Sequence, residues 1–482
     1  MRAERRRAWW RALRSDTRAQ LRLALPLMVA QLAQTGMALV DTVMTGRFSA
    51  LDLAAVSVGS SLWVPLQLLI VGIVLAVTPV VATARGANRL AGVDAYLRDA
   101  LLLGLLLGVA AAALLWMAGS VFALAGVEEG VASRGIDYLR ALSLGFPALA
   151  LYQVLRSFSE GMAYVRPVLW IGLGGLAFNV PANAILIYGL FGLPAMGAFG
   201  CGLATALSLW VMLIAMLVWM RCASRLRWVR PFRVRVRPKL ANMREVLGIG
   251  VPIGLAIFFE TSLFAVIALL VAGLGAAVIA AHQIALNVAS LLFMLPLSLG
   301  MALTVRVGHA LGVGGPALAR RRAWNGQLIA TGLGVTLASL MLLVAEPVAA
   351  VYTPDTDIRA LAVSLITLAA LFQLSDTLQV NAAGALRGYR DTRFVMLVTL
   401  PCYWGVGLGV GVWLGRSALP PGPLGVHGFW MGLLAGLTAA AVVLLWRLHR
   451  MTRRHNPVRP TGALGPMISA NPPRPAPPPL AG

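Results

Sequence analysis

The stretch of sequence that decides the fold runs from Pro252 to Gly312 and reads PIGLAIFFETSLFAVIALLVAGLGAAVIAAHQIALNVASLLFMLPLSLGMALTVRVGHALG. Glu260 is its only acidic residue, and no Lys or Arg precedes Arg306. An ionisable side chain at the centre of a membrane costs at least about 2.5 to 3.5 kcal/mol, so such residues usually face a polar cavity and serve function. Glu260 is therefore the first candidate site residue.

An earlier part of the chain resembles this stretch at a nearly constant offset. The matched pairs are separated by 226 positions, rising to 227 and 228 towards the end of each half, and include Pro26 with Pro252, Thr78 with Thr304, Gly86 with Gly312, Gly161 with Gly388, and Gly197 with Gly425. The constancy of the offset indicates an internal duplication, because isolated matches between apolar segments occur by chance.

The composition is typical of an integral membrane protein. Of its 482 residues 59% are hydrophobic and 12% are charged, with a mean hydropathy of +0.82, which predicts a polytopic helical membrane protein. The net charge of +23 does not indicate nucleic-acid binding, because the basic residues do not gather in one soluble patch.

Apolar runs of about 20 residues predict an all-α integral membrane protein with twelve transmembrane helices. The predicted spans are 21–45, 53–80, 98–124, 136–156, 167–189, 199–220, 246–271, 278–305, 323–345, 360–386, 394–414 and 428–446. A cytoplasmic N-terminus puts all but five of the 40 Lys and Arg residues on the inner side, as the positive-inside rule requires. Both termini are then cytoplasmic, and anionic lipids are the expected contact of the basic residues.

The chain divides into five parts on this reading. They are a basic cytoplasmic N-terminal arm (1–20), a first lobe of six spans (21–220), a basic cytoplasmic inter-lobe loop (221–245), a second lobe of six spans (246–447), and a basic, then Pro-rich, disordered cytoplasmic tail (448–482). Cys201, Cys222 and Cys402 show no metal-binding or disulfide spacing.

Each lobe offers a candidate cation site. In the first lobe, Asp41 lies about 28 Å along a helix from Arg22, at a depth similar to that of Asn179 and Asn183. The two asparagines are one helical turn apart, and Pro181 between them frees a backbone carbonyl. These oxygens suit a proton or a small cation; interhelical hydrogen bonding is the alternative. In the second lobe, Glu260 and Asp376 are the carboxylates inside predicted spans.

No enzyme motif is present. The five histidines are scattered, and the sequence contains no HExxH, GxSxG or Walker A pattern. We expect no catalytic residues and no cofactor.

Several strings resemble the multidrug and toxic compound extrusion (MATE) family, in its bacterial NorM-type branch. They include QLAQTGMALVDTVMTGRFSALDLAAV at 31–56, PIGLAIFFETSLF at 252–264 and QLSDTLQVNAAGALRGYRDT at 373–392. The resemblance covers residues 20 to 450. It implies two six-helix lobes that form a V around a central cleft, in a multi-pass protein of the bacterial inner membrane.

The resemblance also implies a function and a set of residues. It implies export of cationic or amphipathic organic compounds in exchange for Na⁺ or H⁺, by a protein expected to be a monomer. Asp41, Asn179 and Asn183 would couple cations in the first lobe, and Glu260 and Asp376 in the second, where they would hold sodium if sodium is the coupling ion. Positions that match the substrate contacts of the family are Gln34, Ser61, Gln283 and Asp355. Pro354 departs from the family pattern beside Asp355.

Other functions remain open from the sequence. A lipid-linked glycan flippase of the same superfamily would line its cleft with basic residues, whereas the charged residues inside the predicted spans are acidic. An integral-membrane transferase would need an interfacial cluster of histidines and carboxylates. The sequence leaves the coupling ion and the substrates undetermined.

Overall fold

A computed structural model describes residues 2–119, 122, 127–226, 237–416 and 424–453. The helices of the first half are α1 (Arg2–Phe48), α2 (Ala50–Val74), α3 (Val77–Gly86), α4 (Val93–Trp116), α6 (Glu129–Ser143), α7 (Phe146–Gly161), α8 (Arg166–Tyr188), η1 (Leu190–Gly192), α9 (Gly197–Cys222) and η2 (Ser224–Leu226). Those of the second half are α10 (Leu240–Ala272), α11 (Ala276–Gly312), α12 (Pro316–Tyr352), α13 (Thr356–Gly388), α14 (Thr392–Leu400), η4 (Pro401–Gly407), α15 (Leu408–Arg416) and α16 (Val426–Arg453).

The described part of the chain contains eleven helices that are long and apolar enough to cross a membrane, or twelve if α6 and α7, bent by 45°, form one span. Each of the twelve predicted spans falls on one of them. The fourth prediction, 136–156, was too short, because α6 and α7 together run from Glu129 to Gly161. The predicted N-terminal arm continues into the first span within α1. Residues 227–236 of the predicted inter-lobe loop and 454–482 of the predicted tail lie outside the described residues.

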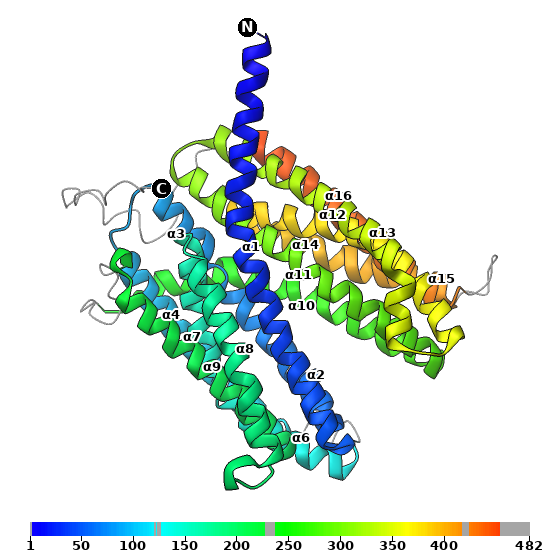
Figure 1. The fold of residues 1–482 in the computed structure, drawn as a ribbon. Coiled ribbons are helices and arrows are strands. Elements are labelled where there is room, and N and C mark those ends of the chain that lie inside the picture. Colours follow the sequence, from blue (N-terminus) through cyan, green and yellow to red (C-terminus); the bar gives the residue numbers. More distant parts are fainter. Residues whose placement is uncertain (1, 120–121, 123–126, 227–236, 417–423, 454–482) are drawn as a thin grey trace.

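The helices form two lobes arranged as a V (Figure 1). The first lobe contains α1 to α9 and the second contains α10 to α16. The lobes meet where α2 packs on α10, α3 on α11 and α1 on α11. We call the end of the bundle at which α1 begins and α16 ends the terminus face; the lobes separate towards the opposite end (Figure 1).

Two glycines at equivalent positions of the repeat make equivalent contacts across the interface between the lobes. A Cβ atom on Gly86 would collide with the carbonyl oxygen of His309, and a Cβ atom on Gly312 would collide with that of Thr83. Residues 83 and 309, like 86 and 312, are 226 positions apart, so one contact is the other with the lobes exchanged. Such an exchange is what a two-fold relation between duplicated halves produces.

A hydrogen bond inside each lobe is repeated, with donors 226 and acceptors 227 positions apart. The Thr78 hydroxyl donates to the Ser157 carbonyl at 3.1 Å, and the Thr304 hydroxyl donates to the Gly384 carbonyl at 2.7 Å. Gly161 packs on Thr78 in the first lobe as Gly388 packs on Thr304 in the second. The predicted duplication is therefore confirmed in three dimensions.

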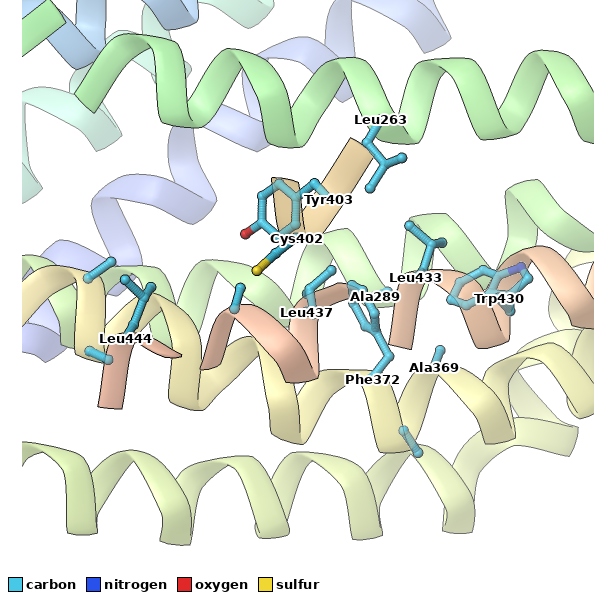
Figure 2. Close-up of a cluster of buried hydrophobic side chains, with 14 of the residues drawn as sticks. Leu263, Ala289, Ala369, Phe372, Cys402, Tyr403, Trp430, Leu433, Leu437 and Leu444 are labelled. Carbon is cyan, nitrogen blue, oxygen red and sulfur yellow. The ribbon is translucent and has the colours of Figure 1, made fainter. Parts of the chain in front are cut away.

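The core of the second lobe is a continuous apolar cluster between α10, α11, α13, η4 and α16. Leu263, Phe372, Tyr403 and Trp430 lie within it, and the Phe372 and Trp430 rings meet edge to face at 6.1 Å between centroids (Figure 2). Aromatic pairs in this geometry stabilise a core beyond their buried area. This packing joins α13, which carries Asp376, to the other helices of the second lobe.

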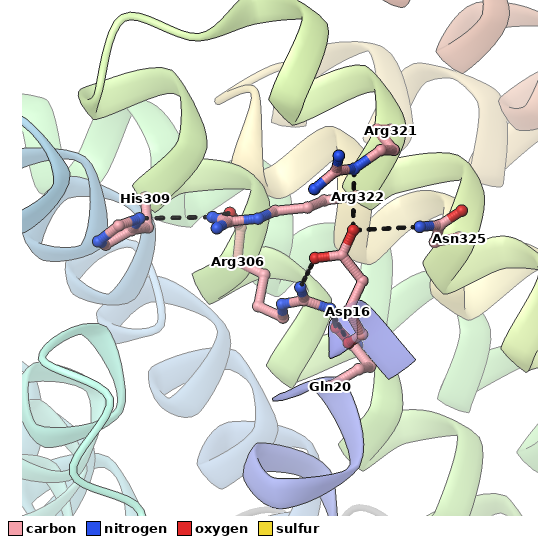
Figure 3. A network of polar contacts seen from close by, with 7 residues as sticks. All are labelled: Asp16, Gln20, Arg306, His309, Arg321, Arg322 and Asn325. Atoms are coloured by element: carbon pink, nitrogen blue, oxygen red, sulfur yellow. Dashed lines mark hydrogen bonds and ion pairs between the residues drawn. The ribbon is translucent and has the colours of Figure 1, made fainter. Parts of the chain in front are cut away.

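Helix α1 belongs to both lobes. Its later part packs on α8 of the first lobe, whereas Asp16 and Gln20 contact α11 and α12 of the second. Asp16 accepts from Arg306 at 2.7 Å, from Arg321 at 2.9 Å and from Asn325 at 3.3 Å (Figure 3). Gln20 donates to the Leu299 carbonyl at 3.0 Å. Asp16 and Arg306 are both buried. The terminus face is therefore closed by a charged contact between α1 and the second lobe.

We expect Asp16→Asn to lower the midpoint of thermal unfolding of the purified protein by several degrees. The change leaves the buried Arg306 guanidinium without its carboxylate, and a hydrogen bond to a charged group contributes about 1.5 to 3 kcal/mol. Asp357→Asn is the matched control, because Asp357 is exposed at the start of α13. Equal midpoints for the two variants would contradict a stabilising role for Asp16.

Candidate functional site

The first-lobe site is built around Asp41 on α1. The amide nitrogen of Asn183 donates to Asp41 Oδ1 at 2.6 Å, and the hydroxyl of Thr205 donates to Asp41 Oδ2 at 2.8 Å. The Asn183 amide also donates to Asn179 Oδ1 at 3.1 Å. Asp41, Asn179 and Asn183 are buried. The structure thus brings together the three residues that the sequence placed at similar depth.

Helix α8 presents the two asparagines on one face because they are four residues apart. Asn183 Oδ1 is buried and has no hydrogen-bond partner within the protein. A buried acceptor without a donor costs about 1 to 3 kcal/mol. The free oxygen beside Asp41 is suited to a bound cation or to a donor carried by a ligand. Thr205 on α9 was not predicted, since a threonine in an apolar span gives no distinctive signal.

A second polar cluster in the first lobe was also missed. Arg156 and Glu160 on α7 form an ion pair at 2.8 Å, and only 2% and 1% of their side-chain surfaces are exposed. The Arg156 guanidinium also donates to Gln34 at 2.8 Å and to Gln31 at 2.5 Å, both on α1. The expectation that the charged residues inside the spans are acidic was wrong, because α7 extends past Arg156 and buries it. The predicted substrate contact Gln34 is engaged by this guanidinium.

The second-lobe site contains Glu260 on α10 and Asp376 on α13. The rings of Phe264 on α10 and Phe372 on α13 meet edge to face at 6.0 Å between centroids. Glu260 and Asp376 each lie one helical turn from these rings, so the two carboxylates are carried by helices that contact each other at this level. Asp376 is buried, with 2% of its surface exposed, and its Oδ1 atom has no hydrogen-bond partner within the protein, whereas Glu260 is half-buried. Two negative charges held together without donors repel each other, which favours capture of a proton or a metal cation.

Two further residues that the sequence did not indicate are buried in the second lobe. Tyr403 on η4 has a buried hydroxyl group without a hydrogen-bond partner among the described residues. Arg387 on α13 is 8% exposed and takes part in none of the ion pairs among the described residues. The indole of Trp404 donates to the Phe259 carbonyl at 3.2 Å and so ties η4 to α10 next to Glu260.

The other three predicted substrate contacts are exposed residues. Ser61 is exposed on α2 and its hydroxyl donates to the Ser57 carbonyl of its own helix at 3.2 Å. Gln283 is exposed on α11. Asp355 caps the start of α13, where it accepts from the backbone amides of Asp357 and Ile358. The structure therefore gives Asp355 a local role as a helix cap.

Buried carboxylates in each of two duplicated, membrane-spanning lobes are characteristic of secondary transporters, which place ion and substrate sites near the interface of such repeats. The class of protein that the fold and the sites define is thus a polytopic membrane transporter. The pattern of the MatE family matches residues 26–185 and again residues 252–413, one match in each lobe. The chain belongs to this family, and its NorM-type character is confirmed by its relatives.

Two bacterial relatives cover nearly the whole chain. Multidrug resistance protein PmpM of Pseudomonas aeruginosa is 48% identical over 443 residues, which are 92% of this chain and 93% of the relative. Multidrug resistance protein NorM of Photobacterium profundum is 43% identical over 435 residues, which are 90% of this chain and 95% of the relative.

Solved structures of low sequence identity share the fold. A eukaryotic MATE transporter, AtDTX14, superposes with a TM-score of 0.82 at 19% identity and covers 92% of this chain and 98% of its own. An outward-facing multidrug resistance MATE transporter of the MOP superfamily superposes with a TM-score of 0.82 at 20% identity, over 91% of this chain and 97% of its own. The predicted fold class, two helical lobes in a V, is confirmed.

Proposed function

We propose that this chain is a secondary active multidrug efflux transporter of the bacterial inner membrane, which exports cationic organic compounds in antiport with Na⁺ or H⁺. The names of the bacterial relatives and their coverage of nearly the whole chain support the efflux function. The observation that carries the coupling is the buried carboxylate oxygen of Asp376, which has no hydrogen-bond partner among the described residues. An isolated buried charge is unstable unless a proton or a cation joins it.

The site residues have distinct proposed roles. Glu260 and Asp376 bind the coupling ion, and the Tyr403 hydroxyl supplies an uncharged oxygen beside them. Asp41, with Asn179 and Asn183, forms the first-lobe site, where a cationic substrate and the coupling ion compete for one carboxylate. Gln34, Ser61, Gln283 and Asp355 remain proposed substrate contacts.

The flippase alternative needs free basic groups in the membrane for pyrophosphate. Among the buried arginines, Arg156 is paired with Glu160 and Arg306 is paired with Asp16. These guanidinium groups are compensated within the protein, which supports the antiporter over the flippase.

Transport into or out of proteoliposomes tests the proposed function. Purified protein is reconstituted, a fluorescent organic cation is loaded inside, and a sodium gradient and a pH gradient directed inwards are imposed separately. We expect one gradient to accelerate efflux. An efflux rate that neither gradient changes would contradict antiport.

We further propose that the terminus face is cytoplasmic and that the lobes are bounded at residues 21–220 and 246–447. In a variant whose three native cysteines are replaced, Ala50→Cys at the start of α2 is expected to react with an impermeant thiol reagent added outside intact cells, and Ser224→Cys in η2 is expected to remain unlabelled. Labelling of Ser224→Cys alone would invert the orientation.

A further inference from the structure

Two polar contacts near the terminus face join the first helix of one lobe to the third span of the other. The Asn325 amide on α12 donates to Asp16 Oδ2 on α1 at 3.3 Å. The Asn242 amide on α10 donates to Asp99 Oδ2 on α4 at 2.7 Å. Asp16, Asp99 and Asn242 are buried. Both contacts therefore cross from one lobe to the other at the end where the lobes meet.

The internal repeat relates the two contacts to each other. Asp16 and Asn242 are 226 positions apart, and so are Asp99 and Asn325. The same two positions of the repeat thus meet twice, with the carboxylate and the amide exchanged between them. A two-fold relation between duplicated halves places such equivalent pairs on either side of the lobe interface. We call the pair Asp16 and Asn325 the first clasp, and the pair Asp99 and Asn242 the second clasp.

The carboxylate of each clasp accepts further hydrogen bonds from the opposite lobe. Asp16 accepts from Arg306 on α11 at 2.7 Å and from Arg321 on α12 at 2.9 Å (Figure 3). Asp99 Oδ2 accepts from the backbone amide of Lys239, directly before α10, at 3.1 Å. Hydrogen bonds to an ionised carboxylate are stronger than those between neutral groups. Both clasps therefore oppose separation of the lobes at the terminus face.

Opening of the transporter at the terminus face requires both clasps to break. The lobes already separate towards the opposite end (Figure 1). Transporters built from two repeats expose their sites to each side in turn, largely by rocking of one repeat against the other. Because the two clasps are equivalent under the two-fold relation, such a movement pulls both pairs apart together.

We propose that the two clasps form the gate of the terminus face: they stabilise the conformation in which this end is closed, and both break before the transporter opens here. This inference rests on the proposed transport function. The gate acts on the equilibrium between two conformations, which is measurable without ion or substrate. The clasp residues are thus positioning residues, which set the arrangement of the lobes.

Distances between spin labels on the two lobes test the proposal in the purified full-length chain, with its three native cysteines replaced. Ala91→Cys/Ala317→Cys labels the terminus face, and Ala50→Cys/Ala276→Cys labels the opposite end. All four positions are exposed, and the two members of each pair are 226 positions apart. Double electron–electron resonance then gives the populations of short and long distances at each end.

Asn242→Asp sets two carboxylates against each other in the second clasp. We expect the distance to lengthen at the terminus face and to shorten at the opposite end, in a population about tenfold or more above that of the wild type, because repulsion replaces a hydrogen bond to a charged group. The exchange Asp99→Asn/Asn242→Asp restores one carboxylate and one amide, as in the first clasp, and should return both populations to near wild type. Asp94→Asn is the matched control on α4, because Asp94 accepts from the Ala95 amide of its own helix, and it should change neither population.

Asp16→Asn tests the first clasp independently and should shift both distances in the same direction as Asn242→Asp. A contact that only stabilises the fold would lower the unfolding midpoint and leave the distances unchanged. If Asn242→Asp yields no folded protein, Asp99→Asn takes its place with the same expected direction.

Unchanged distances in the folded variants of both clasps overturn the gate, as does a shift in Asn242→Asp that the exchange does not reverse. Gradient-driven efflux from proteoliposomes is measured separately with the wild type. Efflux together with unchanged distances in the variants would refute the gate and leave the proposed function intact. Shifted distances without gradient-driven efflux would support the gate and contradict antiport.

Discussion

Proteoliposomes that contain Glu260→Gln or Asp376→Asn are expected to show no gradient-driven export, although both proteins insert and fold. Each change removes one negative charge and keeps nearly the same volume, so the packing of α10 and α13 is preserved. Only one carboxylate then remains to hold the coupling ion in the second lobe. A second-lobe site that no longer binds the ion cannot link the ion gradient to export.

The control for these variants is Asp357→Asn, which removes an exposed carboxylate near the start of α13, the helix that carries Asp376. Its export rate should equal that of the wild type. Folding is checked by size-exclusion elution and by thermal unfolding in detergent. Wild-type export by either site variant would refute a coupling role for the second-lobe carboxylates.

Glu160→Gln is expected to destabilise the protein strongly. The Arg156 guanidinium is 2% exposed and would remain buried without its carboxylate. Removal of one partner from a buried ion pair typically costs about 3 to 5 kcal/mol, because the other charge stays buried and uncompensated. The measurement is the thermal unfolding midpoint of the purified protein together with the yield of folded protein from membranes.

Two further variants separate charge from packing. Arg156→Met/Glu160→Leu removes both charges and should be more stable than Glu160→Gln, since no uncompensated charge remains. Glu346→Gln breaks the ion pair with Arg359, in which the Glu346 side chain is 60% exposed and the Arg359 side chain is 33% exposed. This change should alter the free energy of unfolding by about 0 to 1 kcal/mol. If Glu160→Gln were as mild as Glu346→Gln, the Arg156 charge would not depend on Glu160.

The apolar runs predicted every span because a helix must cover the full hydrocarbon thickness. A run of about twenty apolar residues is recognised even when its ends are misplaced by a few residues. One misplaced end hid a buried ion pair. The fourth span was expected to stop at Arg156, and the helix continues to Gly161. Arg156 and Glu160 are four residues apart, which places them on one helix face. This spacing was the sequence signal for the buried pair.

Asp41, Glu260 and Asp376 were identifiable because carboxylates are rare inside apolar runs. The residues that surround them were not. Thr205 and Tyr403 belong to types that are common in membrane helices and acquire a role only through packing. The contact of Asp16 with Arg306 joins residues separated by 290 positions, and no local pattern links them. Tertiary packing alone brings these partners together.

The measurement that tests the central claim most directly is equilibrium binding of a fluorescent organic cation to the purified protein, titrated with sodium and, separately, with pH. A cationic ligand about 4 Å from an ionised carboxylate gains about 4 kcal/mol at an effective dielectric constant of 20, part of which is lost to desolvation. Neutralising that carboxylate with the coupling ion removes most of the attraction, and the coupling is reciprocal. The account predicts that one of the two ions weakens ligand binding in the wild type and that this effect is lost in Asp41→Asn. Ligand affinity that is independent of both sodium and pH would contradict it.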